Sequence, residues 1–186
     1  MSSNMIDFTY DPIIAAVRDR DSFEAALNAP PELIFLLKSS ILDIGTYIDR
    51  AHENGKKLFV HVDLAEGIGK DEVGVSYLAS LGVDGIISTR TGIVRAAKEA
   101  GLLCVQRFFM IDSRSVDTAA ESLIQSRADM VELMPGVACK AIAKMKKRTR
   151  VPIIAGGLVD EKSEIIAALS AGASAISTGN TALWDQ

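Results

Sequence analysis

The sequence lacks the features that would anchor a protein in a membrane or hold it together with disulfides. No apolar run approaches the ~18 residues of a membrane span. The opening residues, MSSNMIDFTY, contain no apolar signal-peptide core. The two cysteines, Cys104 and Cys139, form neither a disulfide framework nor a metal-binding or redox spacing. We therefore expect a cytoplasmic protein that has no membrane partner, no bound metal and no cofactor.

An excess of basic charge and low-complexity sequence are also absent. Twenty Lys and Arg residues and 24 Asp and Glu residues leave a net charge of −4. The chain therefore has no global basic field that attracts nucleic acid or membranes. No linker or shift of composition interrupts residues 1–186, which we interpret as one domain. The sequence does not decide between a monomer and a homo-oligomer.

What the chain does contain is a repeat of short apolar runs and helical patterns. The predicted strands are 12–17, 32–37, 57–64, 85–88, 102–108, 129–133, 152–157 and 173–180. The predicted helices are 22–29, 43–54, 71–81, 92–100, 115–126, 136–147, 160–172 and 181–186. Asp21 is the expected N-cap of the first helix. Such β–α units, with apolar strands, argue for a parallel sheet.

Eight units predict an α/β fold in which the sheet closes into a small (β/α)8 TIM-like barrel. The chain is short for this fold, which typically needs ~200 residues or more. We therefore expect short helices, and one unit that has no proper helix. A doubly wound open sheet is the alternative. The absence of G-x-G-x-x-G after the first strand weakens a dinucleotide-binding interpretation.

The last two strands both end in small residues, a pattern typical of a phosphate site. In (β/α)8 barrels, the loops after these strands commonly bind phosphate. A short helix is expected to follow them, and a helix N-terminus favours anions. An alternative is that the glycines only form tight turns. The candidate phosphate-binding residues are Gly156, Gly157, Ser177, Thr178, Gly179 and Asn180.

Polar residues also gather at the carboxyl ends of other predicted strands. Because side chains alternate along a strand, we expect His61 and Asp63 to point into the barrel. The aliphatic face of the same strand, formed by Val60, Val62 and Leu64, should then meet the helices. Either Gln106 or Arg107 should point inward, with the other at the rim. The candidate residues for binding the part of a phosphorylated ligand beyond its phosphate are His61, Asp63, Arg90, Gln106, Arg107 and Glu132.

Each of these residues also has a structural interpretation. A histidine in a strand is often only hydrogen-bonded, and Glu132 with Arg107 could form a buried ion pair. His61, Asp63 and Glu132 could otherwise supply acid–base chemistry to an isomerase-like or aldolase-like enzyme acting on a triose or sugar phosphate. The sixth strand has no inward lysine for a Schiff base. The residues themselves therefore indicate a small phosphorylated ligand, bound by an enzyme or by a sensor.

Several longer motifs, in order along nearly the whole chain, are more particular than a glycine loop. They are VHVDLAEGIGKDE (60–72), DGIISTR (84–90), VQRFFMIDS (105–113), DMVELMPG (129–136), PIIAGGLV (152–159) and the terminal ST-x-x-x-x-LW. With these motifs the chain resembles the glycerol-3-phosphate-responsive antiterminator family. The resemblance implies a barrel-like regulator, not an enzyme. It would bind glycerol 3-phosphate as effector and act on leader mRNA to prevent premature termination of glycerol-catabolism transcripts. A metabolite-binding protein without an RNA partner is a further alternative.

RNA binding by a chain of net negative charge requires a local basic surface. Residues 137–159 contain no acidic residue and include the densest basic run, which could neutralise phosphates. Lysines at a helix C-terminus also favour the helix dipole and are often simply solvated. The candidate RNA-binding residues are Lys140, Lys144, Lys146, Lys147, Arg148 and Arg150.

Overall fold

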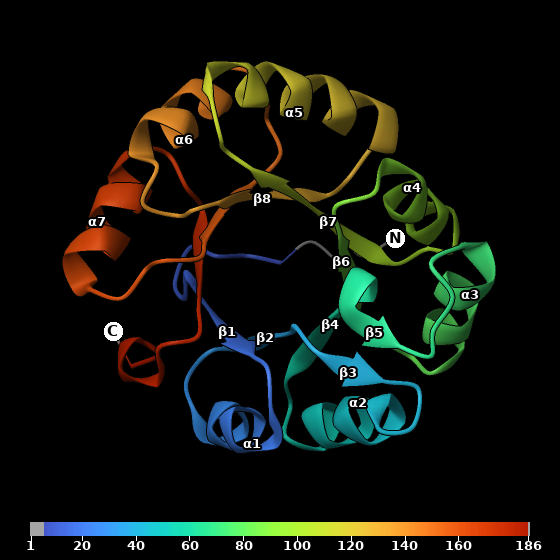
Figure 1. The fold of residues 1–186 in the computed structure, drawn as a ribbon. Helices are drawn as coiled ribbons and strands as arrows, with labels where there is room; N and C mark the ends of the chain where they lie inside the picture. Colours follow the sequence, from blue (N-terminus) through green and yellow to red (C-terminus); the bar gives the residue numbers. More distant parts are fainter. Residues whose placement is uncertain (1–5, 186) are drawn as a thin grey trace.

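The protein, described here as a computed structural model over residues 6–185, is built around eight parallel strands closed into a barrel. Around the barrel the strands follow the order β1-β10-β9-β8-β7-β6-β4-β2, and the helices lie outside them (Figure 1). The predicted (β/α)8 barrel is confirmed. Residues 1–5, which begin the segment interpreted as lacking a signal-peptide core, and Gln186 lie outside the described residues.

The elements are short, as the chain length requires. The barrel strands are β1 Ile13–Val17, β2 Leu33–Leu36, β4 Lys57–His61, β6 Gly85–Ser88, β7 Leu103–Phe109, β8 Met130–Met134, β9 Ile153–Gly156 and β10 Ala175–Thr178. The helices are α1 Arg20–Asn28, α2 Ile44–Glu53, α3 Glu72–Ser80, α4 Thr91–Glu99, α5 Ser113–Ser126, α6 Cys139–Lys146 and α7 Lys162–Ser170. Two small strands, β3 Ser39–Ser40 and β5 Ala65–Glu66, pair outside the barrel, and the 3-10 turns are η1 Val62–Leu64 and η2 Thr181–Leu183.

Three local predictions need correction. Asp19, not Asp21, is the N-cap of α1, because its carboxylate accepts the Ser22 N–H in a capping box. In place of the helix predicted over 181–186, only the single turn η2 follows β10, so the expected unit without a proper helix is the eighth. The third strand ends at His61, and the chain then turns into η1, which leaves Leu64 51% exposed instead of facing the helices.

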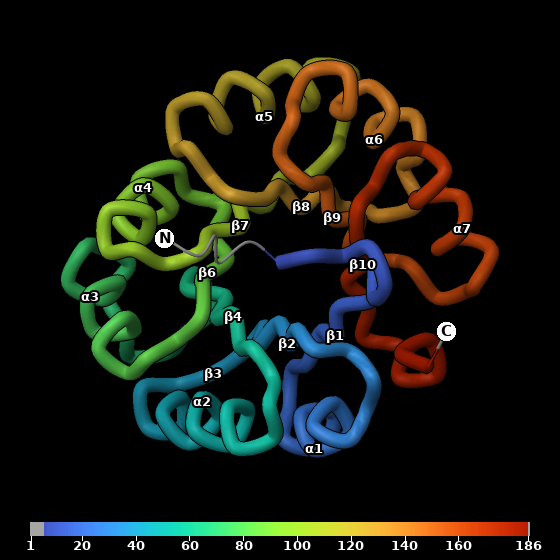
Figure 2. The backbone as a smooth tube through the Cα atoms, turned by 180° about the vertical axis from the view of Figure 1, so that it is seen from behind, coloured from blue at the N-terminus to red at the C-terminus, as the bar shows by residue number. Residues whose placement is uncertain are grey.

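The core has two layers, because both faces of each strand are covered. The larger layer lies between the strands and the helices. The smaller layer fills the barrel, where Phe35 and Phe59 stack with their ring centroids 5.8 Å apart. Ile6 and Phe8 pack against it from residues 6–12, which cross the barrel axis in Figure 2. Apolar packing therefore fills the barrel up to its carboxyl end, where polar side chains replace it.

Candidate ligand-binding site

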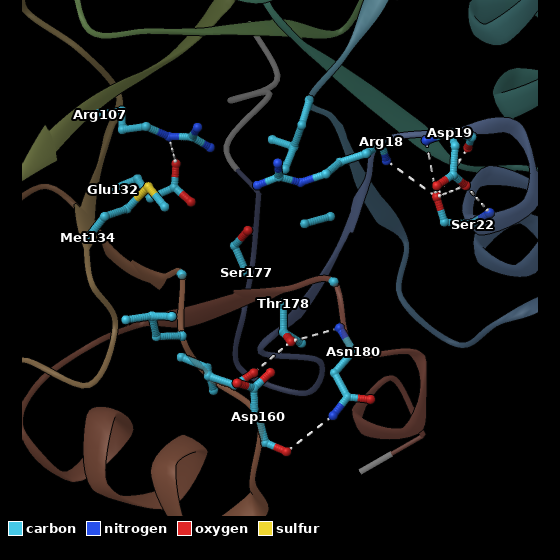
Figure 3. Close-up of a pocket in the computed structure, with 16 residues that line it drawn as sticks. Arg18, Asp19, Ser22, Arg107, Glu132, Met134, Asp160, Ser177, Thr178 and Asn180 are labelled. Atoms are coloured by element: carbon cyan, nitrogen blue, oxygen red, sulfur yellow. Dashed lines mark hydrogen bonds and ion pairs between the residues drawn. The ribbon is translucent and has the colours of Figure 1, made fainter.

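A cavity of about 400 Å³ opens at the carboxyl end of the barrel (Figure 3). Inward side chains of β7 and β8 and the loops after β1, β9 and β10 surround it. Its lining residues are Ala16, Arg18, Asp19, Ser22, Leu37, Arg107, Glu132, Met134, Gly157, Leu158, Val159, Asp160, Ser177, Thr178, Gly179 and Asn180. Seven of the predicted ligand-binding residues are among them. The structure therefore brings together side chains that lie far apart in the sequence.

A buried ion pair forms one wall of this cavity. Arg107 and Glu132 are paired neighbours on β7 and β8, and the Arg107 Nε donates to a Glu132 carboxylate oxygen at 2.6 Å. Glu132 is only 1% exposed. The bond uses Nε alone, so the two terminal nitrogens of the guanidinium keep their donors for a ligand. Arg107 and Glu132 thus form the buried ion pair and also line the cavity.

The two glycines of the PIIAGGLV motif have different roles. Gly156 does not line the cavity, and a Cβ at this position would lie 2.2 Å from a Glu132 carboxylate oxygen. It therefore makes room for the ion pair. Gly157 does line the cavity and has φ +76°, a conformation that favours glycine. Leu158 follows with φ 57° and is 70% exposed beside the cavity, and such uncommon backbone conformations cluster at ligand sites.

The end of β10 supplies one free hydroxyl and two structural side chains. Ser177 points its hydroxyl into the cavity (Figure 3). The Thr178 hydroxyl instead donates to the Val159 carbonyl, and the Asn180 amide donates to the Asp160 carbonyl. These bonds fix the loop after β9 against the loop after β10. Because η2 is a single turn, its dipole adds little, and the predicted helix contribution to phosphate binding is weak.

Sequence reasoning missed Arg18, which follows β1 directly. Its side chain extends into the cavity from the wall opposite Arg107 (Figure 3). Within residues 6–185 its guanidinium forms no ion pair. Arg18 lies just after a predicted strand, as the candidate residue Arg90 does. This position is the sequence signal that would have identified Arg18. The carboxylates of Asp19, Glu132 and Asp160 line the same cavity, and Glu132 pairs with Arg107. Arg18 is therefore the cation that this cavity offers to an anion.

Asp63 holds the mouth together and has little capacity left for a ligand. One carboxylate oxygen accepts the Ser88 hydroxyl at 2.7 Å, and the other accepts the Thr89 N–H and hydroxyl at 2.8 and 2.9 Å. Burial raises the pKa of Asp63, but these hydrogen bonds outweigh it and hold the pKa below its usual range. The Arg90 side chain is largely exposed, and its Nε lies 3.9 Å from an Asp63 carboxylate oxygen. Neither residue lines the cavity beside Ser177.

His61 is the least satisfied polar group in the barrel. It is 5% exposed, and neither ring nitrogen has a hydrogen-bond partner in the described part of the chain. The nearest carboxylate, that of Asp63, is 3.9 Å away. Burial, together with the positive charge of Arg107, lowers the pKa of His61 to about 4. At neutral pH the imidazole is therefore uncharged and offers one donor and one acceptor.

This histidine should make stability depend on pH. Between pH 6.5 and about 4 the unfolded chain binds a proton here that the folded chain does not. The free energy of unfolding should therefore fall as the pH drops through this range, by about 3 kcal/mol in total from His61. Denaturant unfolding at pH 7 and pH 4.5 should show a smaller decrease for His61→Gln than for wild type. Equal decreases would show that folded His61 accepts a proton freely.

Gln106 does not lie at the rim, so this prediction is wrong. It points outward from β7 into the helix layer, where its amide nitrogen donates to the Thr91 and Ser122 hydroxyls. Its carbonyl accepts the Ser126 hydroxyl at 2.6 Å. Gln106 is fully buried and its amide is satisfied there, so it joins α4 and α5 to the barrel.

The basic run is divided between both ends of the barrel. Lys140 lies at the start of α6, beside the loops of the mouth, whereas residues 147–150 precede β9 at the opposite end. Arg148 pairs with Asp117 at 2.8 Å, and Lys144 lies 3.5 Å from the same carboxylate. Within residues 6–185, Lys146, Lys147 and Arg150 form no ion pair.

Metal-binding clusters and membrane-spanning helices are both absent from the part of the chain that the structure describes. Over residues 6–185, no three His, Cys, Asp or Glu side chains gather in a way that could hold a metal ion. None of the helices in the same range has the length and apolar character needed to cross a membrane.

Known proteins are similar to this chain in sequence and in fold. The family model described as "Glycerol-3-phosphate responsive antiterminator" matches residues 13–184. The protein YgcP of Escherichia coli (strain K12) is 36% identical over 175 residues, covering 94% of this chain and 92% of YgcP. The crystal structure of the glycerol uptake operon antiterminator regulatory protein from Listeria monocytogenes has a TM-score of 0.91 and 30% identity, over 96% of this chain and 97% of that one. A glycerol uptake operon antiterminator-related protein from Thermotoga maritima has a TM-score of 0.82 and 36% identity, over 92% and 96%. The resemblance in the motifs is confirmed, and the chain belongs to the glycerol-3-phosphate responsive antiterminator family.

Proposed function

We propose that this protein senses glycerol 3-phosphate in the cavity at the carboxyl end of the barrel. The observation that carries the proposal is the convergence of Arg18, Arg107 and the Ser177 hydroxyl on a cavity bordered by glycine loops. Guanidiniums match the geometry of phosphate oxygens, and glycine allows the backbone to approach a ligand closely. The family to which the chain belongs is responsive to the same metabolite.

The ligand is oriented by the chemistry of the cavity walls. We place its phosphate beside Gly157, Gly179 and Ser177, with Arg18 closing the site from the other wall. The hydroxyl groups then extend toward the Glu132 carboxylate, which accepts hydrogen bonds. Asp63 is not assigned to the ligand, although the sequence suggested it, because Ser88 and Thr89 already occupy its oxygens.

We further propose that the ligand-bound protein acts in the cytoplasm on the leader mRNA of a glycerol operon and prevents early termination. Its RNA contacts are assigned to Lys146, Lys147 and Arg150, which are exposed at the end of the barrel opposite the cavity. Glycerol 3-phosphate cannot touch this surface directly. Coupling must therefore arise from a difference in ligand affinity between two states of the protein.

RNA binding with and without glycerol 3-phosphate tests this proposal. Lys146→Glu with Lys147→Glu should weaken leader binding and make its salt dependence shallower, by ~1 in slope for each RNA phosphate that the protein no longer neutralises. Glycerol 3-phosphate binding, measured by calorimetry, should stay nearly unchanged. The charge-matched control, Arg95→Glu with Lys162→Glu, alters exposed residues on α4 and α7 and should bind RNA like wild type.

Two results would contradict parts of the proposal. If the Lys146 and Lys147 variant binds leader RNA like wild type while Arg90→Glu does not, RNA binds at the mouth. Steady consumption of a triose phosphate by the wild type, lost in Glu132→Gln, would favour the enzyme alternative.

A further inference from the structure

A second cavity, of about 420 Å³, lies next to the proposed effector site. Arg18 and Leu37 line both cavities, so the two share a wall. The remainder of the second cavity is formed by the loops after β2 and β4, where β3 pairs with β5. Leu64 and Ile68 give it apolar walls. The mouth of the barrel therefore has two adjoining compartments.

Glycerol 3-phosphate is too small to fill both compartments. It has ten non-hydrogen atoms, and each displaces less than the about 30 Å³ that one water molecule takes in the liquid, so the ligand displaces at most on the order of 300 Å³. The first cavity, at about 400 Å³, already accommodates this volume. The second cavity would then be available to another chemical group. The charges of the residues that line this cavity indicate which kind of group it would bind.

The charges around the second cavity favour an anion. Arg18, Lys38 and Lys70 line it, against two acidic residues, Asp63 and Glu66. Both Asp63 oxygens are occupied by Ser88 and Thr89. Glu66 pairs with Lys38 through a 4.0 Å contact, and both side chains are largely exposed.

The basic groups also keep donors available. The Lys70 ammonium donates to the Ala65 carbonyl and has two further donors. Arg18 is not part of an ion pair within residues 6–185. Its guanidinium has five donors, enough to serve anions in both cavities.

We infer that the second cavity is a second phosphate subsite, which Arg18 joins to the first. This inference rests on the proposed function, because it takes the first cavity as the glycerol 3-phosphate site. The second phosphate group has two sources. It is carried by the same ligand, as in a glycerol bisphosphate, or it is a free phosphate ion that binds beside glycerol 3-phosphate.

Calorimetry on the full chain tests the inference. Inorganic phosphate titrated into protein saturated with glycerol 3-phosphate should bind at one further site. Glycerol 1,3-bisphosphate should bind about tenfold more tightly than glycerol 3-phosphate if one ligand spans both cavities, since tenfold corresponds to one well-formed additional contact. Either result supports the subsite, and the pair of measurements identifies the source of the phosphate.

Variants then locate the site. Lys38→Met with Lys70→Met should remove the added phosphate affinity and leave glycerol 3-phosphate binding within about twofold, well below one tenfold step. Lys38→Met alone, which breaks only an exposed contact, serves if the Lys70 change impairs folding. The control, Lys57→Met with Lys147→Met at the opposite end of the barrel, should bind phosphate like wild type.

The inference fails if loaded protein binds no phosphate and the bisphosphate gains nothing over glycerol 3-phosphate. It fails equally if the control loses as much affinity as the Lys38 and Lys70 variant. A wild-type protein that does not bind glycerol 3-phosphate at all would instead contradict the proposed function.

Discussion

Gly157→Glu is expected to abolish glycerol 3-phosphate binding. Gly157 borders the cavity with φ +76°, and a Cβ there would lie 2.6 Å from the Met134 terminal methyl. The new carboxylate would therefore be directed into a site that we assign to phosphate. Like charges placed together cost several kcal/mol, which corresponds to a loss of about a hundredfold or more. Calorimetry should detect no binding.

Two control variants separate charge from shape at this position. Gly157→Ala introduces the same backbone strain and the same approach to Met134 without the charge, so it should retain measurable, weakened binding. Gly45→Glu adds a carboxylate on α2, where a new Cβ meets nothing within 4 Å, and should bind like wild type. If Gly157→Glu binds glycerol 3-phosphate as tightly as wild type, the phosphate lies elsewhere.

Arg107→Met is expected to cause the largest loss of stability. It would leave the Glu132 carboxylate, 1% exposed, without its partner at 2.6 Å. Removing one member of a buried ion pair typically costs about 3–5 kcal/mol, because the remaining charge stays buried and unpaired. Denaturant unfolding at pH 7 should show this decrease in the free energy of unfolding. Effector binding should be lost as well, because Arg107 lines the cavity.

The double variant Arg107→Met with Glu132→Leu provides the control. Replacing both charges with apolar side chains removes the uncompensated carboxylate, so most of the stability should return. Glycerol 3-phosphate binding should not return, since both polar groups are missing. If the single and the double variant lose equal stability, packing around Arg107, and not the charge of Glu132, supports this part of the barrel.

Patterns along the chain predicted the parallel β–α units, with closure into a barrel as the favoured arrangement, and several residues of the candidate site. Eight apolar runs that alternate with helical patterns indicate parallel strands whose two faces are both buried. The alternation in β8 placed Glu132 inward between the aliphatic residues Val131 and Leu133, as the structure confirms. Glycines at the ends of the last strands predicted the loop at Gly157, which lines the cavity. These features depend on residues close together in the chain, and local patterns report them well.

Which polar groups remain available to a ligand depends on contacts that form when the barrel closes. In β7 polar residues occur on both faces, so alternation did not show that Gln106 faces α4 and α5. The Asp63 carboxylate accepts hydrogen bonds from Ser88, the last residue of the next barrel strand, and from Thr89, which follows that strand directly. Arg18 reaches the cavity from β1, which meets β10 only when the barrel closes. Contacts between units that are distant in the sequence form only when the barrel closes. Whether a side chain is hydrogen-bonded within the protein or available to a ligand is therefore a property of the fold and not of any one segment.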